Sequence, residues 1–155
     1  MIRRFWGCVA LLAVLTLCLG ASARAEGDEF TGKKAPEFTV QDVNGNTLVL
    51  SELVKTKIVW LNFWGLRCGP CVRELPALQA LSERYAPKGL LILGVNTDGV
   101  PADFIQKSFA EREDLKAAKV AFPLVPDVDF KLIDAYQLMG APLNVMIDHA
   151  GVVQY

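Results

Sequence analysis

Residues 58–76 read Ile-Val-Trp-Leu-Asn-Phe-Trp-Gly-Leu-Arg-Cys-Gly-Pro-Cys-Val-Arg-Glu-Leu-Pro. The first six residues are apolar, aromatic or β-branched except for Asn62, which is typical of a strand buried on both faces of a sheet. A helix is expected to follow, because Gly69 and Pro70 suit a first helical turn and apolar residues then recur at helical spacing. The stretch therefore predicts a strand that runs directly into a helix, with the two cysteines at the junction.

This junction predicts redox chemistry at the cysteines. The N-terminus of a helix carries partial positive charge and unpaired N–H groups, which stabilise a thiolate and lower the pKa of a thiol. Cys68 is therefore expected to be the attacking thiolate, and Cys71, three residues later on the same face, can close a disulfide with it. Arg67 either adds a cation beside Cys68 or is an ordinary solvated side chain at the rim, and both readings stay open.

The motif resembles the thioredoxin superfamily and, more narrowly, its extracytoplasmic TlpA/ResA-like branch. The resemblance rests on Phe63-Trp64-Gly65, on Cys-Gly-Pro-Cys at 68–71 and on Glu-Leu-Pro at 74–76, and it extends from about residue 32 to residue 153. It implies an α/β fold, a thioredoxin-like mixed β-sheet with flanking helices and an amino-terminal β-hairpin extension.

The amino terminus is interpreted as a secretory signal peptide. Arg3 and Arg4 precede an apolar stretch at 5–19, and Ala-Arg-Ala at 23–25 is a small-x-small cleavage site. The protein is accordingly expected in the periplasm or another extracytoplasmic space, anchored at the membrane if the signal is retained. The predicted organisation is a signal peptide over 1–25, a flexible leader over 26–34 and a thioredoxin-like domain over 35–155.

Charge and cysteine content narrow the function further. Removal of residues 1–25 takes away three arginines and no acids, so the net charge becomes 13 − 17 = −4. No basic patch remains to favour nucleic acid or an anionic membrane surface. The cysteines that remain are Cys68 and Cys71, and so close a pair suits exchange, because a structural disulfide usually joins distant segments.

The remaining sequence predicts the elements around this centre. Asn44-Gly45 indicates a hairpin turn, and Ser51 is the expected N-cap of a short helix after it. Gly89 is expected to end the cysteine helix and to precede a strand that lies parallel to the first through a right-handed crossover. Further expected elements are helices over 101–119 and 130–138, a strand from about 143, a turn at 148–151 and a returning strand. The usual last strand and helix would need roughly 20 more residues, so the fold is expected to be incomplete at the carboxyl end.

The resemblance assigns roles to individual residues. In this superfamily the proline before the late strand forms a cis peptide bond and lies against the cysteines, which places Pro142 in that role. Glu74 resembles an acidic residue that takes the proton of the resolving thiol, although a plain surface carboxylate near a helix start is the alternative. Asn62 stands where thioredoxin has a buried aspartate. The residues expected to line the substrate groove are Trp64, which is alternatively a core aromatic, Arg67, Gly69, Pro70 and Ala141.

The implied activity is that of a monomeric protein-disulfide reductase that needs no organic cofactor and no metal. Its expected partners are exported protein disulfides, among them apocytochrome c, and a membrane thiol that supplies electrons.

Four alternative functions share some of these sequence features. An oxidant or isomerase of protein disulfides uses the same motif. The direction of electron transfer depends on the relative stability of the thiolates and the disulfide, not on the motif. A Sco-type copper chaperone uses two cysteines and a late histidine, here His149, but its cysteines are one residue further apart. A structural zinc site needs four ligands, whereas residues 26–155 offer two thiols and one histidine. A peroxiredoxin is disfavoured because no threonine stands three residues before Cys68.

Overall fold

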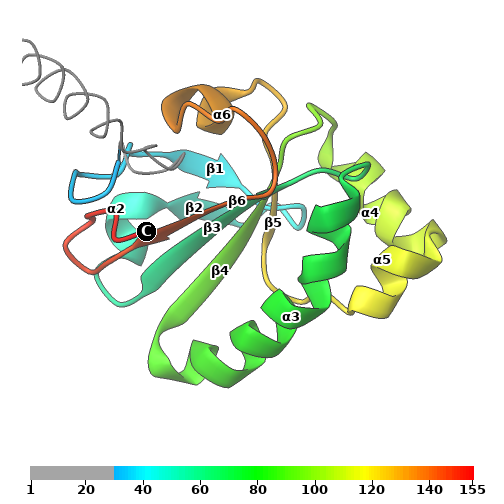
Figure 1. Ribbon diagram of the computed structural model, residues 1–155, viewed down its shortest axis with the longest axis horizontal. Coiled ribbons are helices and arrows are strands. Elements are labelled where there is room, and N and C mark those ends of the chain that lie inside the picture. The colour runs from blue at the N-terminus through cyan, green and yellow to red at the C-terminus, as the bar shows by residue number, and fades with distance from the viewer. Residues whose placement is uncertain (1–29) are drawn as a thin grey trace, which may run out of the picture.

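The computed structural model describes residues 30–155, so the predicted signal peptide and the first part of the predicted leader lie outside the described residues. Its centre is a four-stranded mixed sheet in the order β5-β4-β3-β6 (Figure 1). These strands are β3 (Ile58–Trp64), β4 (Leu90–Asn96), β5 (Leu124–Pro126) and β6 (Leu143–Ile147). β4 pairs in parallel with both β3 and β5, and β6 pairs antiparallel with β3. The predicted thioredoxin-like sheet is confirmed.

Helices and a hairpin cover the two faces of this sheet (Figure 1). One face is covered by α3 (Gly69–Tyr85), α4 (Ala102–Glu111) and α5 (Glu113–Ala118). The other is covered by α2 (Leu50–Leu53), α6 (Lys131–Ala135) and the predicted hairpin, formed by β1 (Thr39–Gln41) and β2 (Thr47–Val49).

The alternation of side chains along β3 divides the core in two. Val59, Leu61 and Phe63 are fully buried on the hairpin side, whereas Trp60 and Trp64 pack on the α3 side. Successive strand residues point to opposite faces, so an uninterrupted apolar strand is the one that can be covered on both. β3 thus holds the middle of the sheet and carries the chain directly into α3.

The expected helix at 101–119 is two helices. Arg112 has extended backbone angles, φ −89° and ψ 122°, and separates α4 from α5. The cysteine helix also ends earlier than expected, at Tyr85, because a 3₁₀ turn (Ala86–Lys88) comes before Gly89, whose φ of +95° suits glycine.

The predicted cap of the short helix is wrong. α2 begins at Leu50, its N-cap residue Val49 contributes no side-chain hydrogen bond, and Ser51 lies inside the first turn. The backbone N–H of Ser51 donates instead to the carboxylate of Glu37 at 2.9 Å. The carboxylate that serves this helix start therefore comes from 14 residues earlier in the chain.

The two ends of the described chain pair with each other. Gly32 N–H donates to Val153 O at 2.8 Å, and Val153 N–H donates to Lys33 O at 2.9 Å. The expected returning strand is present as bridges from Val152 to Lys34 and from Val153 to Ile147. Residues 32–34, which belong to the predicted leader, are thus paired with the last segment. Between residues 30 and 155 the longest helix has 17 residues, and none is long and apolar enough to cross a membrane.

Candidate functional site

Cys68 and Cys71 form a disulfide at the junction of β3 and α3, with an S–S distance of 2.04 Å. Cys68 is the N-cap residue of α3 and is partly exposed, whereas Cys71 lies in the first turn and is fully buried. Only the first sulfur of the pair is therefore open to a partner molecule. The backbone N–H of Cys71 donates to the Cys68 sulfur at 3.3 Å, at the positive end of the α3 dipole.

The peptide bond between Ala141 and Pro142 is cis, and it precedes β6 at the same edge of the sheet. The carbonyl oxygen of Ala141 lies 3.6 Å from the Cys68 sulfur. The structure thus brings together the cysteine pair and the two residues for which the resemblance implied a place beside it.

The carboxylate of Glu74 enters a polar network behind the cysteines. The Asn62 side chain is fully buried on the α3 face of β3, and its Nδ2 donates to Glu74 Oε1 at 2.7 Å and to Asn144 Oδ1 at 3.0 Å. Trp60 Nε1 also donates to Asn144 Oδ1, at 2.8 Å. Glu74 is therefore not a plain surface carboxylate, because a buried amide holds one of its oxygens.

Asn62 itself is only half satisfied. Its Oδ1 is buried and has no hydrogen-bond partner among residues 30–155. Buried polar atoms are nearly always paired, so this oxygen is an exception within the polar network.

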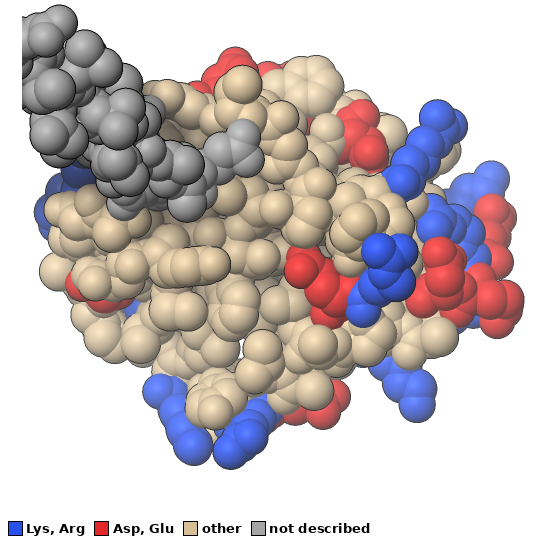
Figure 2. Space-filling view, in the orientation of Figure 1, with Lys and Arg blue, Asp and Glu red and all other residues tan. Residues whose placement is uncertain are grey.

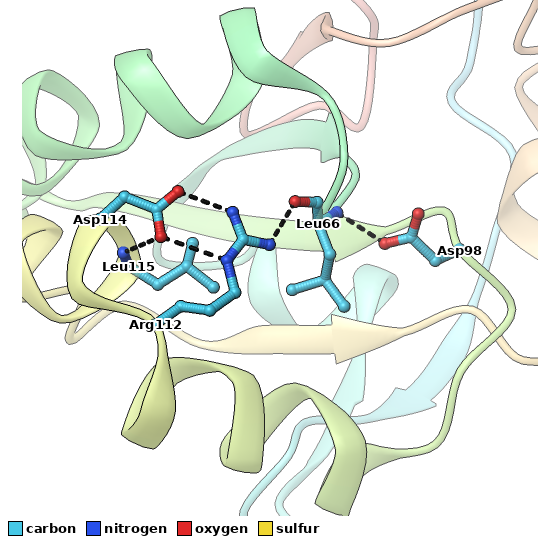
Figure 3. A network of polar contacts seen from close by, with 5 residues as sticks. All are labelled: Leu66, Asp98, Arg112, Asp114 and Leu115. Atoms are coloured by element: carbon cyan, nitrogen blue, oxygen red, sulfur yellow. Dashed lines mark hydrogen bonds and ion pairs between the residues drawn. The ribbon is translucent and has the colours of Figure 1, made fainter.

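A second network fixes the loop ahead of Cys68 (Figure 3). The backbone N–H of Leu66 donates to Asp98 Oδ2 at 2.7 Å, and Arg112 Nη1 donates to the carbonyl oxygen of Leu66. Arg112 also pairs with Asp114, with 2.6 Å between Nη2 and Oδ2. The hydrogen bond from Arg112 is the largest of the effects that hold the pKa of Asp114 below its ordinary value. Both polar atoms of the Leu66 backbone are thus held by side chains from elsewhere in the chain.

Sequence reasoning missed Asp98 and Arg112. The position of Asp98 could have indicated a role, because it is the second residue after β4 and neighbouring parallel strands end at the same edge of a sheet. Arg112 had none, since its segment has the charge pattern of a solvated helix face.

The predicted groove residues do not all lie at the surface. Arg67, Gly69 and Pro70 are exposed around Cys68. Trp64 is fully buried and packs edge-on against Phe109, with 5.8 Å between the ring centroids. Trp64 therefore supports the site from beneath as a core aromatic, and its assignment to the substrate groove is corrected.

His149 lies away from the cysteines. It follows β6, whereas Pro142 precedes that strand, so the five residues of β6 separate the two by roughly 17 Å at 3.3–3.4 Å per residue. Its Nδ1 lies 2.9 Å from the carbonyl oxygen of Val54. Within residues 30–155 no group of three or more His, Cys, Asp or Glu side chains is placed to hold a metal ion.

Comparison with known proteins agrees with this geometry. The AhpC/TSA family model matches residues 31–155. The chain is 33% identical to the thiol-disulfide oxidoreductase ResA of Halalkalibacterium halodurans over 97% of its own length and 84% of that protein. It is also 33% identical to ResA of Bacillus subtilis, over 97% of its length and 83% of that protein.

Solved structures show the same similarity. The thioredoxin domain of a thiol-disulfide oxidoreductase from Bacteroides vulgatus superposes with a TM-score of 0.66 at 28% identity, over 79% of this chain and 84% of that one. A thiol:disulfide interchange protein from a Bacteroides species gives a TM-score of 0.66 at 28% identity, over 80% of this chain and 78% of that one. The chain therefore belongs to the AhpC/TSA family of thioredoxin-like proteins and is a thiol-disulfide oxidoreductase similar to ResA.

Proposed function

We propose that the protein is an exported reductant of protein disulfides. The observation that carries the proposal is the unequal access of the two sulfurs, one partly exposed beside the Ala141 carbonyl and the other fully buried. A two-step exchange needs this arrangement. One thiol has to be accessible to the client disulfide, and the other has to react only with the mixed disulfide that forms first.

In the reduced protein the Cys68 thiolate attacks one sulfur of a client disulfide. A bond forms between Cys68 and that sulfur, the client S–S bond breaks, and the second client sulfur leaves as a thiolate that takes up a proton. Cys71 then loses its proton and attacks Cys68, which frees the first client thiol. Two electrons pass to the client, and the protein is left with the Cys68–Cys71 disulfide, the state seen in the structure. No organic cofactor and no metal takes part.

Glu74 is proposed to accept the proton of Cys71. It lies three residues further along the same helix, and the buried amide of Asn62 holds one carboxylate oxygen and leaves the other available. A carboxylate held in this way can serve as a general base without first reorganising.

The proposal includes a place of action and partners. A secretory signal over residues 1–25 would export a monomeric protein, and a membrane thiol would then return it to the dithiol state. Resemblance to the TlpA/ResA-like branch favours apocytochrome c as a client, because its haem-attachment cysteines have to be reduced before ligation.

Trapping of the mixed disulfide tests the order of attack. A Cys71→Ser variant, reduced and mixed with an oxidised client protein, should accumulate a covalent complex through Cys68 that persists on a non-reducing gel. The matched Cys68→Ser variant should form little complex, because its remaining thiol is buried. A complex that forms through Cys71 instead, or a reduced wild-type protein that leaves the client oxidised, would contradict the proposed function.

A further inference from the structure

An open groove of about 580 Å³ lies directly beside the cysteine pair. Its apolar part is formed by the buried side chains of Leu66 and Val72. Its charged part consists of Arg67, Arg73, Arg112 and Asp114. Three guanidinium groups thus face a single carboxylate in this groove.

The charges in the groove do not cancel. Arg112 and Asp114 neutralise each other through their ion pair. Arg67 and Arg73 are both exposed, and neither has a carboxylate partner within residues 30–155. The groove therefore carries a surplus of two positive charges in a chain whose formal net charge is −1.

The neighbouring helices show that this surplus is local. On α4, Lys107 lies 3.9 Å from Glu111, and on α5, Lys116 lies 2.8 Å from Glu113. Figure 2 shows the acidic and basic side chains interspersed on the side of the molecule where these two helices lie. The unpaired arginines are therefore not part of a general basic surface.

Both arginines lie at the start of the cysteine helix, Arg67 directly before Cys68 and Arg73 within α3. The guanidinium of Arg73 lies over Gly69, the residue after Cys68, since a β-carbon built on Gly69 would be 3.3 Å from Arg73 Nη1. A polypeptide whose disulfide reaches Cys68 has to pass close to these two guanidinium groups.

We propose that this groove binds an acidic segment of the client polypeptide, next to the disulfide that Cys68 attacks. Guanidinium groups bind carboxylates through paired, charge-assisted hydrogen bonds, and two unpaired ones beside an apolar surface suit Asp or Glu alternating with apolar residues. The inference rests on the proposed function and adds the class of client to it.

The test uses three disulfide-containing peptides that differ only in the residues flanking their cysteines, which are Glu, Gln or Lys. The full protein is reduced beforehand, and the second-order rate constant for reduction of each peptide is measured at low and at high salt. At low salt the Glu peptide should react roughly three- to tenfold faster than the Gln peptide, the range expected for two exposed ion pairs, and the Lys peptide should react more slowly. High salt should bring the three rates together.

Variants assign this preference to the groove. The double variant Arg67→Gln, Arg73→Gln should lower the ratio of Glu to Gln peptide rates to about 1. The ratio is used because loss of a cation near Cys68 also changes the thiolate itself, and that change affects both peptides equally. Arg84→Gln is the matched control, since it removes the same charge from the last turn of the same helix and should leave the ratio as it is.

The outcomes separate this inference from the proposed function. Equal rates for the Glu and Gln peptides at low salt, or a preference that persists in the double variant, would overturn the acidic-client inference while the reductase activity stands. If the wild-type protein reduces none of the three peptides, the proposed function fails and the inference fails with it.

Discussion

At the scale of single residues, the two cysteines are distinguished by their positions around one helix start. Cys68 caps α3 and remains partly exposed, whereas Cys71 in the first turn is fully buried in the cluster that contains Trp64 and Leu75. Exposure and the helix dipole favour a thiolate at the first position. Burial at the second position agrees with the proposed order, in which Cys71 reacts only after a mixed disulfide has formed.

Glu74→Gln tests the proposed proton acceptor. The glutamine side chain still reaches the Asn62 amide, but it cannot take a proton from Cys71. We predict that the mixed disulfide between Cys68 and a client lasts at least about tenfold longer at neutral pH, whereas its rate of formation changes little. Stopped-flow mixing with acid quench and mass spectrometry measures both rates.

Glu83→Gln is the control for this prediction. Glu83 lies on the same helix, is exposed, and accepts a hydrogen bond from Gln79 Nε2 at 2.9 Å. It should leave the lifetime of the mixed disulfide unchanged. Equal lifetimes in wild type and Glu74→Gln would show that Cys71 loses its proton to another group.

Much of the residue-level picture follows from the sequence, because the helix start and the cysteine spacing are local signals, whereas the role of Pro142 follows from the family resemblance alone. The hydrogen bond between Asn62 and Glu74 could not be predicted in this way. The two residues are 12 apart, on β3 and α3, and the bond depends on how deeply that helix lies on the sheet. Likewise, the burial of Trp64 depends on Phe109, which α4 brings over it.

At the scale of elements, the segment between β3 and α3 depends on two side chains that come from other loops. Asp98 follows β4 and receives hydrogen bonds from the Leu66 N–H and from Asn96 Nδ2, at 2.7 and 2.9 Å. Both Leu66 and Asn96 are buried. Asp98 is exposed, yet it satisfies donors that water cannot easily reach.

We predict that Asp98→Ala lowers the free energy of unfolding by about 2 kcal/mol, because two buried donors lose their acceptor. Chemical denaturation measures this loss. Asp103→Ala is the control, since Asp103 accepts a hydrogen bond from Phe104 on the exposed surface of α4, and its removal should cost less than about 0.5 kcal/mol. Similar losses for the two variants would show that the Leu66 contact does not stabilise the fold.

The packing of β4 gives a second prediction at this scale. A β-carbon on Gly94 would lie 2.8 Å from Leu124 Cδ2 and 3.1 Å from Phe122 Cε2, both in the buried core. We predict that Gly94→Ala destabilises the fold by about 1–3 kcal/mol, because these side chains have to move within a packed interior. Thermal denaturation followed by circular dichroism measures the effect.

Gly140→Ala is the matched control for Gly94→Ala. A β-carbon on Gly140 would meet nothing within 4 Å, and the backbone there is not in the left-handed region. This variant should melt at the parent temperature or slightly above it. A Gly94→Ala protein that is equally stable would contradict the close packing between β4 and β5.

Elements were predictable where the apolar period was clear, as in β3, β4 and α3. The break between α4 and α5 was not, because no glycine or proline marks it. Arg112 adopts extended angles there while its side chain reaches the Leu66 carbonyl and Asp114. The break between α4 and α5 thus coincides with a hydrogen bond from Arg112 to a residue 46 positions earlier in the chain, which a local sequence pattern cannot reveal.

At the scale of the whole molecule, the amino-terminal hairpin is tied to the sheet through its turn. Val43 N–H in this turn donates to Leu124 O of β5 at 2.8 Å, and Gln106 Nε2 of α4 donates to Val43 O at 2.7 Å. Asp42 organises the turn, since its carboxylate accepts from the N–H groups of Asn44 and Asn46, each at 2.9 Å. The Asp42 carboxylate thus holds the turn whose Val43 backbone is hydrogen-bonded to β5 and α4.

The pKa of the Asp42 carboxyl group determines how this residue contributes to stability at different pH values. Burial by itself would raise the pKa of Asp42, but the hydrogen bonds from Asn46, Asn44 and Gly45 outweigh it and lower the pKa below 3.8. A carboxyl group with a lower pKa in the folded state stabilises the fold above its unfolded pKa and loses this effect as the pH falls through the folded pKa. Stability should therefore decline below about pH 4.

We predict that Asp42→Asn lowers the free energy of unfolding by about 1–2 kcal/mol at pH 7, and that the difference from wild type shrinks as the pH falls below 4. Urea denaturation at a series of pH values measures both effects. Asp129→Asn, which removes an exposed carboxylate 3.0 Å from Lys131, should change stability little at any of these values. A difference for Asp42→Asn that is constant with pH would exclude the titration of this group.

The order of a buried strand, a helix and a second buried strand predicts the parallel crossover at the centre of the sheet, whereas the full thioredoxin-like architecture follows from the family resemblance. The pairing of residues 32–34 with residues 152 and 153 was not predictable. Those polar, glycine-containing residues have no strand pattern, and their partners lie more than 110 residues away.

The measurement that tests the central claim most directly is the equilibrium reduction potential of the Cys68/Cys71 pair, determined against a dithiol buffer. A reductant of protein disulfides should have a potential near that of thioredoxin, about −270 mV, or lower. A potential near that of DsbA, about −120 mV, would contradict the proposal, since such a pair withdraws electrons from clients and acts as an oxidant or isomerase.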